Sequence, residues 1–131
     1  MTGVMSVQTV ATSPIEGQKP GTSGLRKKTK QFMEPHYLEN FVQSTFNALV
    51  ESNVTVKGGI LVVSGDGRFH NAVAVQTIIK MAFANGVSTV WVGQDGLLST
   101  PAMSAVIRER CNSSGYPADA GKPFGGLKQN Y

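Results

Sequence analysis

Two short, continuously apolar runs with a helical pattern between them constrain the fold of this chain most. Gly59-Ile60-Leu61-Val62-Val63 ends at the turn formers Ser64-Gly65-Asp66-Gly67, and Thr89-Val90-Trp91-Val92 ends at Gly93-Gln94-Asp95-Gly96. Such runs are typical of parallel strands covered on both faces. Between them, a mostly apolar helical pattern spans about Asn71 to Asn85, and Gly86 is suited to end it in the left-handed conformation. The order predicts an α/β fold with a mixed or parallel sheet and flanking helices.

Further elements flank this unit. Apolar residues recur at helical spacing from Tyr37 to Val50, and we expect Pro35 in the first turn of that helix. Thr100 and Pro101 predict an N-cap and an N1 proline for a helix that runs to about Arg110. β-branched residues alternate with polar ones over 6–12, which predicts a half-buried strand leading into the next loop.

The length of 131 residues allows one ordinary domain, and we expect an incomplete one. We assign residues 1–110 to a partial domain that includes a loop at 18–28. From Asn112 the sequence is rich in turn formers without helical or strand period, so we assign 111–131 to a divergent flexible tail. Within that tail, Phe124-Gly125-Gly126-Leu127 has the character of the start of a strand.

Composition excludes several classes of function. No apolar run approaches the roughly 20 residues that cross a bilayer, so we expect no membrane partner. Met1 to Ser13 lacks the pattern of a targeting signal, which favours the cytoplasm. Cys111 is the only cysteine, and the only histidines are His36 and His70, so the chain offers no zinc-type cluster of ligands.

The positive charge is local. The net charge is +4, and the excess gathers around the 18–28 loop, at Lys19, Arg26, Lys27, Lys28 and Lys30. Nucleic acid would be one partner for such a cluster. We do not favour it, because no aromatic residues are interleaved with the cations and no recognition helix is evident. A small phosphorylated ligand and a merely solvated loop remain as alternatives.

The 18–28 loop itself reads Gln-Lys-Pro-Gly-Thr-Ser-Gly-Leu-Arg-Lys-Lys. Its two glycines free the backbone to present successive N–H groups, two hydroxyls lie between them, and three cations follow. This is the chemistry of a loop that holds an oxyanion such as phosphate. Thr22, Ser23 and Arg26 are the candidate binding residues, since a guanidinium fork and hydroxyls suit phosphate oxygens. The alternative is an ordinary turn followed by a solvated basic face.

The loop resembles the N-terminal signature of eukaryotic phosphoglucomutases, members of the phosphohexomutase family. The resemblance covers about Gln18 to Arg110 and is carried further by two other segments, Leu61 to Arg68 and Trp91 to Ala102. It implies the front part of domain I of four domains, with an active site in the cleft where the four domains meet. The activity implied is interconversion of glucose 1-phosphate and glucose 6-phosphate, with Mg²⁺ and glucose 1,6-bisphosphate as cofactors and a hexose phosphate as partner. Arg26 resembles the family arginine that contacts the phosphosugar, with Thr22 and Ser23 in the same loop.

The phosphorylated serine of that family lies in a Thr-Ala-Ser-His-Asn-Pro motif, which does not occur in these 131 residues. The resemblance places the magnesium loop in the second domain. We therefore assign no catalytic residue and no metal ligand, and we expect no mutase activity from the chain alone. The alternative function is a non-catalytic short form that binds a phosphosugar or a partner. The sequence assigns no oligomeric state.

Four other sites invite comparison with catalytic groups. Asp66 and Arg68 follow a strand, where ligands bind in open α/β sheets, but we favour a structural ion pair or a brace of the loop over catalysis. Phe69 stands where a nucleophile would precede His70, so we expect His70 only near a helix start. Ser99 and Thr100 are read first as helix-capping residues. Trp91 is expected in the core.

The resemblance also bears on stability. We expect the sheet to lack a strand, which would leave an interior strand edge and apolar helix faces uncovered. A folded domain is stable by only about 5 to 15 kcal/mol. The isolated chain is therefore predicted to be marginally stable, partly molten or prone to aggregation.

Overall fold

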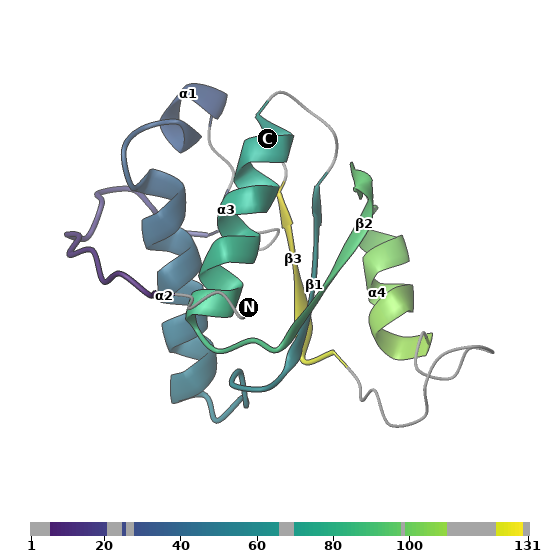
Figure 1. The fold of residues 1–131 in the computed structure, drawn as a ribbon. Coiled ribbons are helices and arrows are strands. Elements are labelled where there is room, and N and C mark those ends of the chain that lie inside the picture. The colour runs from purple at the N-terminus through teal and green to yellow at the C-terminus, as the bar shows by residue number, and fades with distance from the viewer. Residues whose placement is uncertain are drawn as a thin grey trace.

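The computed structural model describes residues 6–20, 25, 28–65, 70–97, 99–109 and 123–129, with the backbone alone described at 29, 94, 95, 100 and 129. Three parallel strands form a sheet in the order β2-β1-β3. The helices α2 and α3 lie on one face of the sheet and α4 lies on the other (Figure 1). The predicted α/β class with a parallel sheet and flanking helices is confirmed.

The elements follow the apolar patterns closely. In chain order they are α1 (Thr29–Phe32), α2 (Tyr37–Glu51), β1 (Ile60–Gly65), α3 (Asn71–Ala84), β2 (Thr89–Leu97), α4 (Thr100–Glu109) and β3 (Gly125–Gln129). Gly86 follows α3 with φ of +94°, as expected for a glycine that ends a helix. The short helix α1 was not predicted, and Pro35 lies in the turn before α2 rather than in its first turn.

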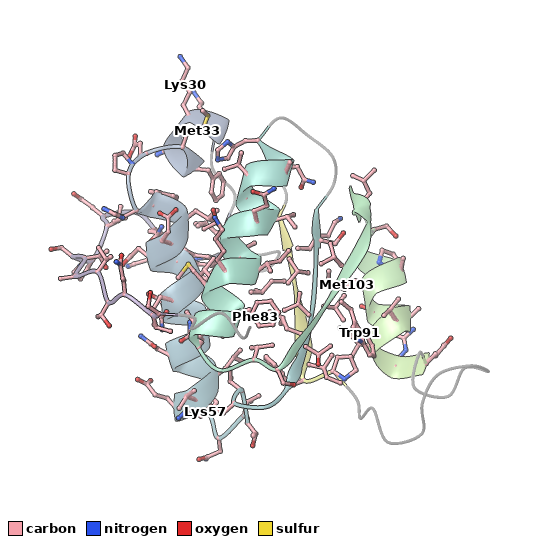
Figure 2. All side chains as sticks on the ribbon, in the orientation of Figure 1. Lys30, Met33, Lys57, Phe83, Trp91 and Met103 are labelled. Atoms are coloured by element: carbon pink, nitrogen blue, oxygen red, sulfur yellow. The ribbon has the colours of Figure 1, made fainter. Side chains whose placement is uncertain are left out.

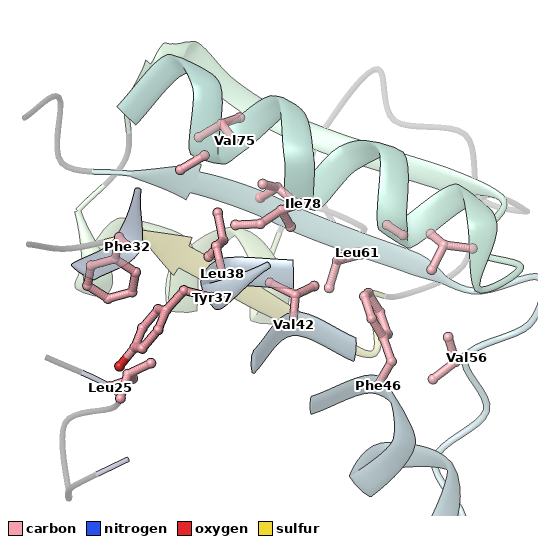
Figure 3. Close-up of a cluster of buried hydrophobic side chains, with 14 residues drawn as sticks. Leu25, Phe32, Tyr37, Leu38, Val42, Phe46, Val56, Leu61, Val75 and Ile78 are labelled. Carbon is pink, nitrogen blue, oxygen red and sulfur yellow. The ribbon is translucent and has the colours of Figure 1, made fainter. Parts of the chain in front are cut away.

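The central strand β1 is buried along its whole length. Its residues Leu61 and Val63 join the main core, which lies between the sheet and the helices α2 and α3 (Figure 3). The contributions of α2 are Leu38, Val42 and Phe46, and those of α3 include Ala74, Val75, Ile78 and Ala82. Trp91 is only half-buried and lies with Met103 on the α4 side of the sheet (Figure 2).

Of two predictions about strands, one is wrong and one is confirmed. Residues 6–12 are exposed and form no strand, because no strand among the described residues pairs with them; Val7 and Val10 are each 59% exposed. The strand start predicted at Phe124 to Leu127 is confirmed, since Gly125–Gln129 form β3 and pair with β1 from Leu61 to Gly65. β1 thus has a parallel neighbour on each side, and the open edges in the described sheet are the outer ones of β2 and β3.

The strand β2 is longer than predicted. The run Thr89–Val92 pairs regularly with β1, but Gly65 pairs next with Leu97, so residues 93–96 form a bulge opposite Ser64. Gly96 has φ of +73°, which matches the turn character expected for Gly93 to Gly96. The bulge lies at the carboxyl end of the sheet.

Candidate phosphate-binding site

One end of the domain gathers the features expected of an anion site. The strands end there, α3 begins there, and α1 lies at the same end (Figure 1). Open parallel sheets bind ligands outside the carboxyl ends of their strands. The 18–28 loop leads directly into α1 and therefore reaches this end of the molecule.

The start of the loop is fixed to α2 by Gln18. Its Nε2 donates to the main-chain oxygen of Tyr37 at 2.7 Å, and its Oε1 accepts from Asn40 Nδ2 at 2.8 Å. Asn40 Oδ1 in turn accepts from Thr12 Oγ1 at 2.6 Å. Because both polar atoms of the Gln18 side chain are used, the chain enters the loop in a defined position.

The far part of the loop is fixed by Leu25, which is buried beside Phe32 and Tyr37 (Figure 3). The rings of Phe32 and Tyr37 meet edge to face with centroids 5.6 Å apart. The main-chain oxygen of Lys28 then accepts from Gln31 N at 2.9 Å as α1 begins. An apolar anchor inside the loop thus complements the polar anchor at its start.

The candidate binding residues Thr22, Ser23 and Arg26 lie outside the described residues. Each is close in sequence to an anchor, since Thr22 and Ser23 lie between Gln18 and Leu25 and Arg26 follows Leu25 directly. Among the described cations, Lys19, Lys28 and Lys30 are exposed around this loop. Their charges favour an anionic ligand at this end of the domain.

The hydroxyl end of the Tyr37 phenol points toward Leu25 (Figure 3). Burial raises the pKa of Tyr37 above its usual value of 10.0, the negative charge of Glu34 raises it further, and the Gln18 side chain offsets part of the shift. Tyr37 is therefore neutral at physiological pH and acts as a packing residue in the anchor.

Asn71 is a residue of this end that the sequence did not single out. It is the first residue of α3, it is 6% exposed, and its Nδ2 donates to Gly96 O in the β2 bulge at 3.3 Å. Its amide group packs against Gly65, where any Cβ would collide with it. Asn71 therefore links the ends of β1 and β2 to the start of α3, a long-range role with no local sequence signal.

The residues that the sequence invited us to compare with catalytic groups lie before α3 and at the start of α4. Asp66, Arg68 and Phe69 lie outside the described residues, so their interpretation stays a prediction. His70 precedes α3 with φ of 72°, which confirms the expectation of a helix start. Ser99 Oγ accepts from Ala102 N at 3.2 Å, so the α4 cap is Ser99, one residue before the predicted Thr100.

No group of three His, Cys, Asp or Glu side chains comes together in the described part of the chain. The described residues therefore do not fit a magnesium site. No helix in the same ranges is long and apolar enough to cross a bilayer.

Residues 17–120 match the family model described as phosphoglucomutase/phosphomannomutase, alpha/beta/alpha domain I. The chain belongs to this family. The boundaries of the match include the 18–28 loop, β1, α3, β2 and α4, so the anchored loop and the carboxyl end of the sheet are parts of one phosphohexomutase domain I. The resemblance drawn from the sequence is confirmed.

Individual phosphoglucomutases support the assignment. The cytoplasmic phosphoglucomutase of Mesembryanthemum crystallinum is 67% identical over 112 residues, which cover 86% of this chain and 19% of that protein. The cytoplasmic enzyme of Pisum sativum is 61% identical over 115 residues, or 88% and 19% of the two chains. A solved structure of pp63/parafusin, a phosphoglucomutase from Paramecium in an open form, is 48% identical with a TM-score of 0.77 and covers 91% of this chain and 20% of its own. The chain thus spans about a fifth of the length of these phosphoglucomutases.

Proposed function

We propose that this chain is the phosphosugar-binding part of a phosphoglucomutase domain I that binds hexose phosphate without transferring its phosphoryl group. The observation that carries the proposal is the double anchoring of the 18–28 loop at the end of the domain where the strands end. Fixing Gln18 and Leu25 before binding reduces the conformational freedom that the chain has to lose when it binds a ligand. The basic charge around it and the family membership point to a phosphate group.

In this proposal Arg26 makes two charge-assisted hydrogen bonds to phosphate oxygens, and Thr22 and Ser23 add single ones. The roles come from the resemblance and from the chemistry of the three side chains. Gln18 is hydrogen-bonded to α2 and Leu25 is buried, so two described positions of the loop are fixed. The chain's own contribution is therefore binding and orientation of the phosphosugar.

Phosphoryl transfer needs more than these groups. Within the 131 residues there is no Thr-Ala-Ser-His-Asn-Pro motif to donate a phosphoryl group. Magnesium and glucose 1,6-bisphosphate, the cofactors that the family implies, would act in an enzyme that supplies the serine and the metal ligands. By analogy with its relatives, which are named cytoplasmic, we place the chain in the cytoplasm and in glucose metabolism.

The test of inactivity is a coupled assay for conversion of glucose 1-phosphate into glucose 6-phosphate by the purified chain, with Mg²⁺ and glucose 1,6-bisphosphate present. We expect no turnover above a blank. Turnover that scales with the amount of chain and disappears in Arg26→Ala would show that another nucleophile acts, and would overturn this part of the proposal.

The test of binding is a calorimetric titration of the chain, once with glucose 6-phosphate and once with glucose. We expect glucose 6-phosphate to bind and glucose not to bind, with binding weakened by added salt because the contacts are charged. Arg26→Ala should abolish most of the signal. Lys57→Ala, which changes an exposed lysine next to Gly58 on the turn before β1, is the matched control and should leave it unchanged. Equal binding of both sugars would contradict the proposal.

A further inference from the structure

Asn85 and Gly86 form the only Asn-Gly pair in the sequence, and they lie where α3 ends. Asparagine followed by glycine is the pair most open to deamidation, because glycine has no side chain to keep its nitrogen away from the preceding amide. We propose that Asn85 is a deamidation site that the contact between α2 and α3 keeps closed, and that its modification prevents the domain from regaining its original packing. This inference is independent of phosphosugar binding.

The chemical step balances without an added oxidant or reductant. The main-chain nitrogen of Gly86 forms a bond to Cγ of Asn85, the bond from Cγ to the amide nitrogen breaks, and ammonia leaves with the proton from Gly86 N. Water then opens the resulting succinimide ring at either carbonyl. The products are aspartate and isoaspartate at position 85, and isoaspartate places one extra carbon in the main chain.

The folded chain holds the reacting side chain away from this path. Asn85 and Gln43 form a reciprocal amide pair, in which Gln43 Nε2 donates to Asn85 Oδ1 at 2.8 Å and Asn85 Nδ2 donates to Gln43 Oε1 at 2.9 Å. Asn85 Nδ2 also donates to Met81 O at 2.8 Å. The amide is therefore fixed by three hydrogen bonds, two that connect it to α2 and one to the last turn of α3.

The attacking nitrogen is held as well. Gly86 N donates to Phe83 O at 3.0 Å, and Asn85 has ψ of 5°, which turns the following nitrogen away from its side chain. Ring closure requires that this hydrogen bond and the amide pair both open. Openings of this kind are local and less costly than global unfolding, so the deamidation rate reports on the contact between α2 and α3.

The products fit the site poorly. A carboxylate at position 85 has no N–H to offer Gln43 Oε1 or Met81 O, and its charge lies at the negative end of the α3 dipole. Isoaspartate would also displace Gly86, whose oxygen accepts from Gly58 N at 2.8 Å just before β1. The modified chain therefore loses the connection from the end of α3 to both α2 and the turn before β1.

The experiment follows deamidation of the full chain by peptide mapping and mass spectrometry during incubation in mildly alkaline buffer, with and without concentrated urea. We expect deamidation at Asn85 to be about tenfold or more slower without urea, as for a site reached by local opening. Gln43→Ala should raise the deamidation rate in buffer most of the way to the rate in urea. It should leave the rate in urea unchanged. Thr45→Ala, which removes a hydrogen bond within α2 to Phe41 O, should not accelerate the reaction.

Two results would overturn the proposal. One is an equal rate of deamidation in buffer and in urea, which would show that this chain does not protect Asn85. The other is equal acceleration by Gln43→Ala and Thr45→Ala, which would show that the amide pair has no special part. Asn85→Asp provides a second measurement, since it should lower the melting temperature by several degrees, and an unchanged melting temperature would contradict the predicted effect of the product.

Discussion

Ser64 has a hydroxyl group without a hydrogen-bond partner in the described part of the chain, although its side chain is fully buried. A buried, unpaired polar group costs about 1 to 3 kcal/mol. We therefore predict that Ser64→Ala raises the free energy of unfolding by about 1 kcal/mol. The measurement is the shift of the urea midpoint followed by circular dichroism.

Ser88 provides the control for that prediction. Its hydroxyl lies close enough to donate to Gly58 O at 2.9 Å and to Gly59 O at 3.0 Å, so Ser88→Ala should lower the stability. If both substitutions lowered the midpoint, the Ser64 hydroxyl would have to be satisfied in solution, for example by a buried water molecule.

Tyr37 predicts a pH dependence of stability. Its pKa in the folded chain is raised, chiefly by burial, whereas in the unfolded chain it has its usual value of 10.0. Below pH 10 the phenol is protonated in both states and contributes no slope. Above it the unfolded chain loses the proton first, so the free energy of unfolding should fall as the pH rises through the folded pKa. Measuring the urea midpoint of unfolding at a series of alkaline pH values tests this. The midpoint of Tyr37→Phe should decrease less with pH than that of the original chain. An equal fall in both proteins would assign it to other groups.

At the scale of elements, β3 is the strand with the weakest side-chain support. Gly125 and Gly126 begin it, and they face opposite sides of the sheet. A Cβ on Gly125 meets nothing within 4 Å, whereas a Cβ on Gly126 would lie 2.5 Å from Met103 Sδ in α4. We predict that Gly125→Val stabilises the chain by about 1 kcal/mol, because valine suits strands and open space is present. Gly126→Val should destabilise it by about 1 to 3 kcal/mol through overpacking.

Urea unfolding of the two valine variants checks this prediction, and each serves as the control for the other. The same sign of effect in both would contradict the packing of α4 on β3. A larger loss in Gly125→Val than in Gly126→Val would mean that the two faces of the strand are reversed.

The sequence predicted the helices and central strands well, because their patterns reflect burial that the fold provides. The pattern at 6–12 misled because alternation shows only that a segment could pair, and no partner strand is present among the described residues. The predicted strand at 89–92 ended too early, because glycines are typical of turns and of β-bulges alike. In the structure β2 continues through a bulge to Leu97. The predicted N-cap of α4, Thr100, was one residue too late, because serine and threonine are both favoured at this position and Ser99 is the residue that caps.

The candidate binding residues remain a prediction, because they lie outside the described residues, whereas the contacts around them are described. The composition of the 18–28 loop pointed to an anion and to Thr22, Ser23 and Arg26. The anchors were not foreseen, because Gln18 contacts Tyr37 and Asn40 across about 20 residues of sequence. Asn71 was missed for the same reason, since its contact with Gly96 depends on how α3 lies over the sheet.

For the whole molecule, the earlier expectation of marginal stability remains a prediction. The outer edges of β2 and β3 are open in the described sheet, and Val92 and Leu97 of β2 are 45% and 46% exposed. Open edges favour association between chains. We expect the isolated chain to unfold at low urea and to self-associate, as measured by calorimetry together with light scattering. A sharp, cooperative thermal transition of a dispersed monomer would contradict this.

The strand order β2-β1-β3 also has a consequence for synthesis on the ribosome. β1 is made before both of its neighbours, and β3 reaches it only after α3, β2 and α4 have been translated. At a translation rate of roughly 5 to 20 residues per second, the edge of β1 that pairs with β3 stays unpaired for several seconds after β1 has been made. Nascent chains translated close together on one messenger RNA would meet during that interval, so slower translation should increase their co-aggregation.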